Sequence, residues 1–585
     1  MAALHTFSAI AVILIIIDAA KCIDVNITGA GVVRGTSRTL EGRVVDTFTG
    51  IPYAKPPTGN LRFKAPEKAK AWEGVRNSTS TIYCPQKSIL SSDIFGNEDC
   101  LYLNVYRPRN SPGTNVSVMV WIHGGSYRYG AGGIYDGEML AAANNVVVVT
   151  VNYRLGLLGF FYVPGTQTKG NYGLRDQILA LQWVQSHIQS FGGDPKQVTI
   201  FGESAGSGSV TLLMLSPLAK GLFKRVIAQS GVPSNYWAVQ RPQNNSLARK
   251  IGETLHCNNT NNLTSCMRGK SWQELMKVQV KLFEAHPCVT PTVDGVVITE
   301  YPPDQMKNDT LHASGVELLL GFNKDEGSMF IPSLTKWDES VYRGLLHERI
   351  QWQYEMSTGL VVDMAAFEYT HFEQKIAWLK YVLSINDFIN DFDFKIGISN
   401  FADAWAKTGA KTYLYHFTHM PKYARVPTWG VAHAIEIDFI FGKALYSIAD
   451  PKRYSGTLVA NFTSEERNIS RTMMGMWTDF AKTGIPANTW PTYNGIKMEY
   501  LEIQEKTMVK SNFGPKKMHF WNKYVPGMMK RVNEKTCPTL KPVVCTTASP
   551  SITSTTTKKV VNRSSKNEHA FVFIYIFAAA FLFAL

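Results

Sequence analysis

At positions 201–206 the chain reads Phe201-Gly202-Glu203-Ser204-Ala205-Gly206, with glycines two positions before and two positions after a serine. Such spacing permits a strand to turn sharply into a helix and leaves the serine hydroxyl exposed above a sheet. Ser204 is therefore the candidate nucleophile. Taken alone, the stretch is equally compatible with an ordinary turn, because glycine and serine are common turn residues.

The residues around this stretch favour the sharp turn. A helical pattern over 177–188 is followed by a Gly-Gly-Asp-Pro loop at 192–195 and by the β-branched run Val198-Thr199-Ile200. A run compatible with a helix then continues from the serine to Leu215. This order of strand, turn and helix is the setting that the motif requires.

A second glycine-rich turn lies upstream. A buried strand is predicted over 116–122, and it leads into His123-Gly124-Gly125-Ser126-Tyr127. This turn resembles the His-Gly-Gly-Gly turn whose backbone N–H groups supply oxyanion donors in lipases and esterases. A short helix around 139–143 and another strand over 146–152 follow. The repeated alternation of strand and helix predicts an α/β protein with a large, mostly parallel central sheet flanked by helices.

Composition is that of a large folded protein. The 585 residues are 45% hydrophobic, 12% aromatic and 18% charged, and nothing in the middle of the chain resembles a linker. The formal net charge is +14. Because the lysines and arginines are scattered singly or in pairs, a solvated surface is favoured over a nucleic-acid site, and no nucleic-acid partner is expected.

Both termini differ in composition from the middle. Residues 1–22 contain a short apolar run followed by small residues, which predicts a signal peptide; a short membrane anchor is the alternative. From residue 536 to 565 the chain is rich in Pro, Thr, Ser and Lys, which indicates a flexible stalk. The final stretch, 566–585, ends in an apolar run that predicts a removable GPI-attachment signal, with a membrane-spanning tail as the alternative.

Export to an oxidising compartment predicts glycans and disulfides. Ten Asn-x-Ser/Thr sequons occur, at Asn26, Asn77, Asn115, Asn244, Asn258, Asn262, Asn308, Asn461, Asn468 and Asn562. The chain has eight cysteines, and seven remain if Cys22 leaves with the signal peptide, so one thiol is expected to be free or paired between chains. Closeness in sequence favours Cys84 with Cys100 and Cys257 with Cys266, although sequence alone does not settle the connectivity.

A series of short motifs in a fixed order resembles the type B carboxylesterase and cholinesterase family of α/β-hydrolases. The motifs span about residues 25 to 530, and they are Gly50-Ile51-Pro52-Tyr53-Ala54, Glu98-Asp99-Cys100-Leu101-Tyr102-Leu103-Asn104, Val151-Asn152-Tyr153-Arg154, Asn171-Tyr172-Gly173-Leu174-Arg175-Asp176-Gln177, the Ser204 turn, Asp325-Glu326-Gly327, His433 and Phe520-Trp521-Asn522. The resemblance implies one α/β-hydrolase catalytic domain over residues 23–535.

Catalytic roles follow from the resemblance at the matching positions. It implies Ser204 as nucleophile, Glu326 as the acid of the triad and His433 as the base, in the chain order that this fold uses. The backbone N–H groups of Gly125, Ser126 and Ala205 are the expected oxyanion donors. Ser126 departs from the family, which usually has glycine there, and its side chain is expected to crowd the substrate carbonyl or to disfavour the backbone angles.

Aromatic residues that cholinesterases use to bind their substrate are missing from this chain, and their absence indicates the substrate class. Between Cys84 and Cys100 there is no tryptophan to hold a quaternary ammonium group, and Phe95 is the one aromatic residue there. The segment 285–288 lacks the paired phenylalanines that narrow the acyl pocket of acetylcholinesterases. Trp237, Met329 and Phe330 are the expected pocket residues. A general carboxylesterase with a roomy acyl pocket is therefore predicted, with a cholinesterase as the alternative.

A non-catalytic adhesion protein of the neuroligin type is the further alternative, because such proteins share the His-Gly-Gly-Ser-Tyr turn but lack the nucleophile. Retention of Ser204, Glu326 and His433 together favours the enzyme. The mechanism requires no cofactor and no metal. The expected partners are a small ester, the membrane through a lipid anchor and a second copy of the chain, at the cell surface or outside the cell.

Overall fold

The protein is described here by a computed structural model. The structure describes residues 21–535, apart from these positions: 90, 110–114, 242–245, 258–261, 284–288, 309, 312–314, 333–335, 355–357, 423–429 and 450–461. The predicted stalk at 536–565, the predicted anchor signal at 566–585 and most of the predicted signal peptide at 1–22 lie outside the described residues. Within them, no helix combines the length and the apolar character needed to cross a membrane.

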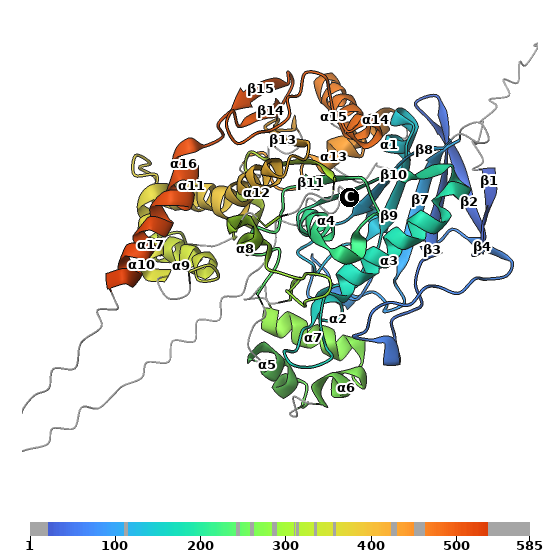
Figure 1. The fold of residues 1–585 in the computed structure, drawn as a ribbon, viewed down its shortest axis with the longest axis horizontal. Helices are drawn as coiled ribbons and strands as arrows, with labels where there is room; N and C mark the ends of the chain where they lie inside the picture. Colours follow the sequence, from blue (N-terminus) through green and yellow to red (C-terminus); the bar gives the residue numbers. More distant parts are fainter. Residues whose placement is uncertain are drawn as a thin grey trace, which may run out of the picture.

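One sheet of 13 strands organises the fold (Figure 1). Its order is β1-β2-β3-β7-β9-β8-β10-β11-β12-β13-β14-β15, and β4 pairs with β2. The bounds of these strands are β1 Lys21–Ile27, β2 Gly31–Leu40, β3 Arg43–Pro52, β4 Val75–Asn77, β7 Tyr102–Pro108, β8 Val116–Ile122, β9 Val147–Val151, β10 Gly193–Glu203, β11 Arg225–Gln229, β12 Glu317–Asn323, β13 Thr412–Phe417, β14 Glu499–Ile503 and β15 Met508–Ser511. From β9 to β14 every pairing is parallel. The pairings from β1 to β9 along this order and that of β14 with β15 are antiparallel, and β4 pairs in parallel with β2.

Helices connect the strands and cover the sheet. Their bounds are α1 Glu138–Asn144, α2 Gly156–Phe160, α3 Tyr172–His187, α4 Ala205–Leu215, α5 Ser246–Thr254, α6 Leu263–Arg268, α7 Trp272–Phe283, α8 Pro302–Lys307, α9 Glu339–Ile350, α10 Thr358–Tyr369, α11 Ala377–Ile389, α12 Ile396–Lys407, α13 Ile437–Ile440, α14 Lys443–Ala449, α15 Ser464–Thr483, α16 Pro515–His519 and α17 Val525–Lys535. This confirms the predicted large, mostly parallel central sheet flanked by helices.

Successive side chains along the central strands point to opposite faces of the sheet, so the hydrophobic core is divided between the two faces. On β8, Val118 and Val120 are buried in the cluster that includes the apolar side chains of α3 and α4. Met119 and Trp121 are buried in the other cluster, with α1 and α15. Figure 1 shows α3 and α4 lying across the sheet. The central strands are therefore buried on both faces, and functional groups are left to the loops at their ends.

The predicted elements agree with the structure except at two boundaries. The strand over 116–122 is β8, and the helix that follows the serine ends at Leu215 as predicted. The helix predicted to start at Gln177 starts at Tyr172, because the apolar pattern continues one turn further back. The Gly-Gly-Asp-Pro loop is in part the irregular start of β10, where Gly193 pairs with Val116 ahead of a register shift.

Two disulfides join the predicted cysteines, Cys84 with Cys100 and Cys257 with Cys266. Among the described residues Cys22 is a free cysteine, exposed on β1. The other three cysteines, at positions 288, 537 and 545, lie outside the described residues. The location of the predicted unpaired thiol therefore stays a prediction.

Candidate active site

Ser204 occupies the sharp turn that its sequence predicts. β10 ends at Glu203 and α4 begins at Ala205, and Ser204 between them has φ 57° and ψ −123°. Positive φ is uncommon for a residue with a side chain. The flanking glycine at 202 allows close packing, because a β-carbon there would lie 2.6 Å from the carbonyl oxygen of Ile122. The turn therefore depends on this glycine for space.

Glu326 and His433 come together although they are 107 positions apart. Glu326 is the first residue of the 3-10 helix η6 (Glu326–Phe330), which follows β12 after a two-residue turn, and His433 lies in the loop before α13. The Nδ1 atom of His433 is 2.5 Å from Oε2 of Glu326. Since both side chains are buried, this contact orients the imidazole and leaves its Nε2 atom as the nitrogen available for proton transfer.

The second oxygen of Glu326 is also held. Oε1 accepts hydrogen bonds of 2.6 Å from the hydroxyl of Ser230 and from the backbone N–H of Asn323. Both donors fix this oxygen, so the carboxyl group is held at both of its oxygens. Ser230 is a functional residue that the sequence prediction missed, since a serine after a strand has no distinctive pattern.

A second carboxylate approaches the other side of the imidazole. Oε1 of Glu203 is 2.9 Å from Nε2 of His433, although neither atom has a hydrogen-bond partner of normal geometry. Burial alone would lower the pKa of His433, but the charges of Glu203 and Glu326 outweigh it and raise the pKa well above the ordinary value. Within the described residues the Ser204 hydroxyl makes no hydrogen bond, so the structure does not join it to His433.

The glycine-rich turn after β8 lies against Ser204. A β-carbon at Gly124 would be 3.1 Å from the β-carbon of Ser204 and 2.7 Å from the backbone oxygen of Glu203. Gly125 has φ 101° and Ser126 has φ 55°. In the described part of the chain, the N–H groups of Gly125 and Ser126 have no recorded acceptor. Together with Ala205 at the first turn of α4, they leave donors available beside the serine.

Ser126 adopts the left-handed conformation that the usual glycine would adopt. This is a region that residues with a side chain disfavour, and the side chain of Ser126 is half-buried. Whether that side chain crowds a substrate carbonyl stays a prediction, because no ligand is present.

An aromatic wall adjoins His433. The rings of Phe394 and Phe330 are centred 4.8 Å and 5.2 Å from its imidazole. Trp237 packs 5.8 Å from Phe394 and donates its indole N–H to the backbone oxygen of Asp393 at 2.8 Å. Of the predicted pocket residues, Phe330 therefore lies beside the imidazole, and Trp237 contacts Phe394 in the same wall. Met329 is half-buried in the same 3-10 helix as Phe330.

Phe394 was not predicted from the sequence, and an irregular helix explains why. It belongs to the π-helical segment η8 (Asn390–Lys395) between α11 and α12. A π turn shifts side chains off the regular helical face, so a helical pattern does not show which residue will point at the site. The acyl-pocket segment at 285–288 lies outside the described residues, and its predicted openness stays a prediction.

A third buried carboxyl group completes the cluster. Glu436 accepts hydrogen bonds from Asn323 at 2.5 Å and from Gln229 at 3.1 Å. Burial, and then the charges of Glu203 and Glu326, raise its pKa to about 8. It is therefore mostly protonated at neutral pH, so this group does not add a third full negative charge next to His433.

Comparison with known proteins agrees with this geometry. The model of the carboxylesterase family matches residues 21–521. The chain belongs to the carboxylesterase family. It is 34% identical over 538 residues to an acetylcholinesterase of Bungarus fasciatus, which covers 86% of each protein. It is 34% identical over 544 residues to a cholinesterase of Mus musculus, covering 87% of this chain and 88% of the relative.

A third relative has a different activity in its name. It is a medium-chain fatty acyl-CoA hydrolase precursor of Anas platyrhynchos, 35% identical over 528 residues, covering 85% of this chain and 91% of the relative. Membership of the carboxylesterase family makes the protein a carboxylic ester hydrolase with the α/β-hydrolase fold. The two cholinesterases and the acyl-CoA hydrolase share 34% to 35% identity with this chain, so sequence identity does not assign its substrate.

Proposed function

We propose that the protein hydrolyses carboxylic esters through an acyl-Ser204 intermediate, with His433 as the base and Glu326 as its partner. The observation that carries the proposal is the 2.5 Å contact between His433 Nδ1 and Glu326 Oε2 beside a serine on a sharp strand-to-helix turn. A serine hydroxyl is a weak nucleophile at neutral pH and needs such a base.

The reaction has two halves. In the first, the Ser204 oxygen bonds to the ester carbonyl carbon while its proton passes to Nε2 of His433. The bond from that carbon to the alkoxy oxygen then breaks, and the alcohol leaves with the proton from Nε2. In the second half, water replaces the serine by the same steps, giving the acid and free Ser204. The N–H groups of Gly125, Ser126 and Ala205 stabilise the oxyanion in both halves.

Labelling with a fluorophosphonate tests the proposal, because the reagent reports an activated serine without requiring the natural ester. We expect one label per chain, located on Ser204 by peptide mass spectrometry. Heat-denatured protein is the control and should not be labelled. A label on another serine would contradict the assignment, and the absence of both labelling and ester hydrolysis would favour the adhesion alternative.

For the substrate we propose neutral esters with acyl groups longer than acetyl. The loop closed by Cys84 and Cys100 contains no tryptophan, and Phe95 in it is 37% exposed and packs on Tyr83 at 5.3 Å. A cation held over an aromatic ring gains about 0.5 to 2 kcal/mol. Without that ring, a choline ester loses most of its advantage over an uncharged ester of the same shape.

We therefore expect a higher kcat/KM for a neutral butyrate ester than for acetylcholine. The matched comparison is acetylcholine against 3,3-dimethylbutyl acetate, its neutral isostere, and we expect the two kcat/KM values to agree within about tenfold. Steady-state hydrolysis at constant ionic strength measures both. A strong preference for acetylcholine over the isostere would instead support the cholinesterase alternative.

We also propose that the chain enters the secretory pathway, carries N-glycans and reaches the cell surface on a GPI anchor. Six of the ten sequon asparagines are described, and all six are exposed: Asn26, Asn77, Asn115, Asn262, Asn308 and Asn468. Exposure is what attachment of a glycan requires.

Phosphatidylinositol-specific phospholipase C tests the anchor. When cells that express the full chain are treated with the enzyme, we expect esterase activity to move from the cells to the medium. Mock-treated cells are the control. Activity that stays on the cells until detergent is added would favour a membrane-spanning tail.

A further inference from the structure

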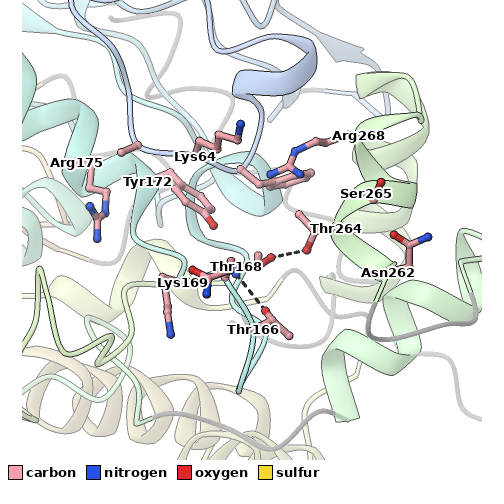
Figure 2. Close-up of a pocket in the computed structure, with 13 residues that line it drawn as sticks. Lys64, Thr166, Thr168, Lys169, Tyr172, Arg175, Asn262, Thr264, Ser265 and Arg268 are labelled. Atoms are coloured by element: carbon pink, nitrogen blue, oxygen red, sulfur yellow. Dashed lines mark hydrogen bonds between the residues drawn. The ribbon is translucent and has the colours of Figure 1, made fainter.

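A cavity of about 500 Å³ lies away from the catalytic groups (Figure 2). Its walls come from the segment 63–65, from the turn at 166–169 with the start of α3, and from α6. It shares no lining residue with the candidate active site. Its volume is within the range of roughly 300 to 1,000 Å³ that is usual for ligand pockets. We call it the basic cavity, for the reason that follows.

Four of its lining residues are cationic and none is acidic. They are Lys64, Lys169, Arg175 and Arg268. Arg175 is 3.7 Å from a carboxylate oxygen of Asp294. For the other three, no ion pair with a described acidic residue is recorded. The cavity thus gathers three cations that form no ion pair with a described acidic residue, together with the paired Arg175, although the sequence shows these residues only as scattered cations.

The floor of the cavity presents a buried hydroxyl group. Tyr172 is 3% exposed, and its hydroxyl has no hydrogen-bond partner of normal geometry in the described part of the chain. Burial raises the pKa of Tyr172, and the backbone of Gly170 together with nearby guanidinium groups acts in the opposite direction. Figure 2 shows the hydroxyl directed toward the centre of the labelled side chains. An unpartnered buried hydroxyl is costly unless a ligand or water satisfies it.

The rest of the lining suits a sugar better than a bare anion. Side chains that can both donate and accept hydrogen bonds line the cavity, among them Thr166, Ser265 and Asn262. An anion alone would use the donor groups of these side chains but not their acceptor oxygens, whereas sugar hydroxyls can use both. The rings of Phe63 and Tyr172, centred 6.5 Å apart and tilted by 58°, add apolar atoms to the lining.

We propose that the basic cavity binds a sugar residue that carries a sulfate or carboxylate group. The anionic group contacts the exposed ammonium groups of Lys64 and Lys169 and the guanidinium of Arg268. The sugar hydroxyls contact the threonine and serine side chains and the hydroxyl of Tyr172. Charge-assisted hydrogen bonds of this kind are the stronger class of polar contact.

Direct titration of the full chain tests this, with N-acetylglucosamine 6-sulfate as the probe. The neutral sugar N-acetylglucosamine and inorganic sulfate are the comparison ligands. We expect saturable binding of the sulfated sugar, tighter by about tenfold or more than either comparison ligand, since each supplies only part of the contacts. Inorganic sulfate that binds as tightly as the sulfated sugar would overturn the proposal, as would equal binding of the neutral sugar.

Two variants with the same net charge separate the cavity from the general surface. Lys64→Gln with Lys169→Gln should weaken binding by roughly fivefold or more, because exposed charge-assisted contacts contribute less than buried ones. Lys196→Gln with Lys220→Gln, at exposed positions outside the lining, should leave binding unchanged. If both pairs of substitutions weakened binding equally, the effect would come from net charge, and the proposal of a site in the basic cavity would be wrong. Ester hydrolysis should stay unchanged in both.

Tyr172→Phe provides a second variant that keeps the fold. Since the hydroxyl makes no hydrogen bond of normal geometry with a described residue, its loss should change the Tm little while weakening the binding of the sulfated sugar. A glycan on Asn262, at the rim, could cover the cavity, so each titration is repeated with Asn262→Gln. Binding that appears only in Asn262→Gln supports the site. Absence of saturable binding in both proteins overturns it.

Discussion

Ser204→Ala is expected to lower kcat for ester hydrolysis by about 10⁴ to 10⁶ with little change in KM or Tm. The side chain supplies the attacking oxygen, and no other group takes its place. In the described part of the chain its hydroxyl makes no hydrogen bond, so its removal leaves no partner unsatisfied. Alanine adopts φ 57° no less readily than serine. Initial rates with p-nitrophenyl butyrate measure the loss, and circular dichroism melting measures the Tm.

Ser207→Ala is the matched control, one turn further along α4. Its buried hydroxyl donates to the backbone oxygen of Gly231 at 2.5 Å, so its loss leaves a buried acceptor unpaired. We expect this variant to lose about 1 to 3 kcal/mol of stability and to keep its rate within about tenfold of wild type. If Ser204→Ala kept a tenth of the wild-type rate, Ser204 could not be the nucleophile.

The sequence predicts those parts of the site that are formed by residues close together in the chain. A strand, a serine between glycines and a following helix occupy one continuous stretch, so spacing alone indicates the turn at Ser204. The glycine-rich turn that carries the expected oxyanion donors Gly125 and Ser126 also lies in one continuous stretch, since it follows directly after β8. By contrast, Glu326 and His433 meet only because β12 and the loop before α13 end at the same edge of the sheet. Without the family resemblance, neither could be chosen from among the other acids and histidines.

Other parts of the site leave no trace in the sequence. Glu203 lies in the predicted motif, yet nothing in the motif shows that its carboxylate will reach Nε2 of His433. Phe394 depends on a π turn, and helical periodicity does not reveal such a turn. The basic cavity depends on three separate segments that each contribute one or two cations. These features arise from tertiary packing, and one chain without an alignment cannot show them.

Glu326→Gln is expected to lower kcat by about 10⁴ while the fold is kept, because the change preserves the shape of the side chain. Glu326 Oε2 accepts a hydrogen bond from Nδ1 of His433, which leaves Nε2 unprotonated and able to take the serine proton. A glutamine amide can donate to Nδ1 instead. The imidazole would then carry its proton on Nε2, where it cannot act as the base. Loss of the negative charge also removes the group that stabilises the imidazolium formed during attack.

Glu203→Gln is the matched control, since it also removes a carboxylate next to the same imidazole but leaves the Nδ1 contact in place. The charge of Glu203 raises the pKa of His433, so its removal should lower that pKa. Because neutral His433 is the active form, kcat/KM rises with pH through this pKa.

The rise of kcat/KM should therefore begin at lower pH in Glu203→Gln, and its plateau value should stay within about a hundredfold of the wild-type plateau. In Glu326→Gln the plateau itself should fall by about 10⁴. Profiles of kcat and kcat/KM from pH 5 to 9 measure both effects, and equal plateaus in the two variants would show that Glu326 acts only through its charge.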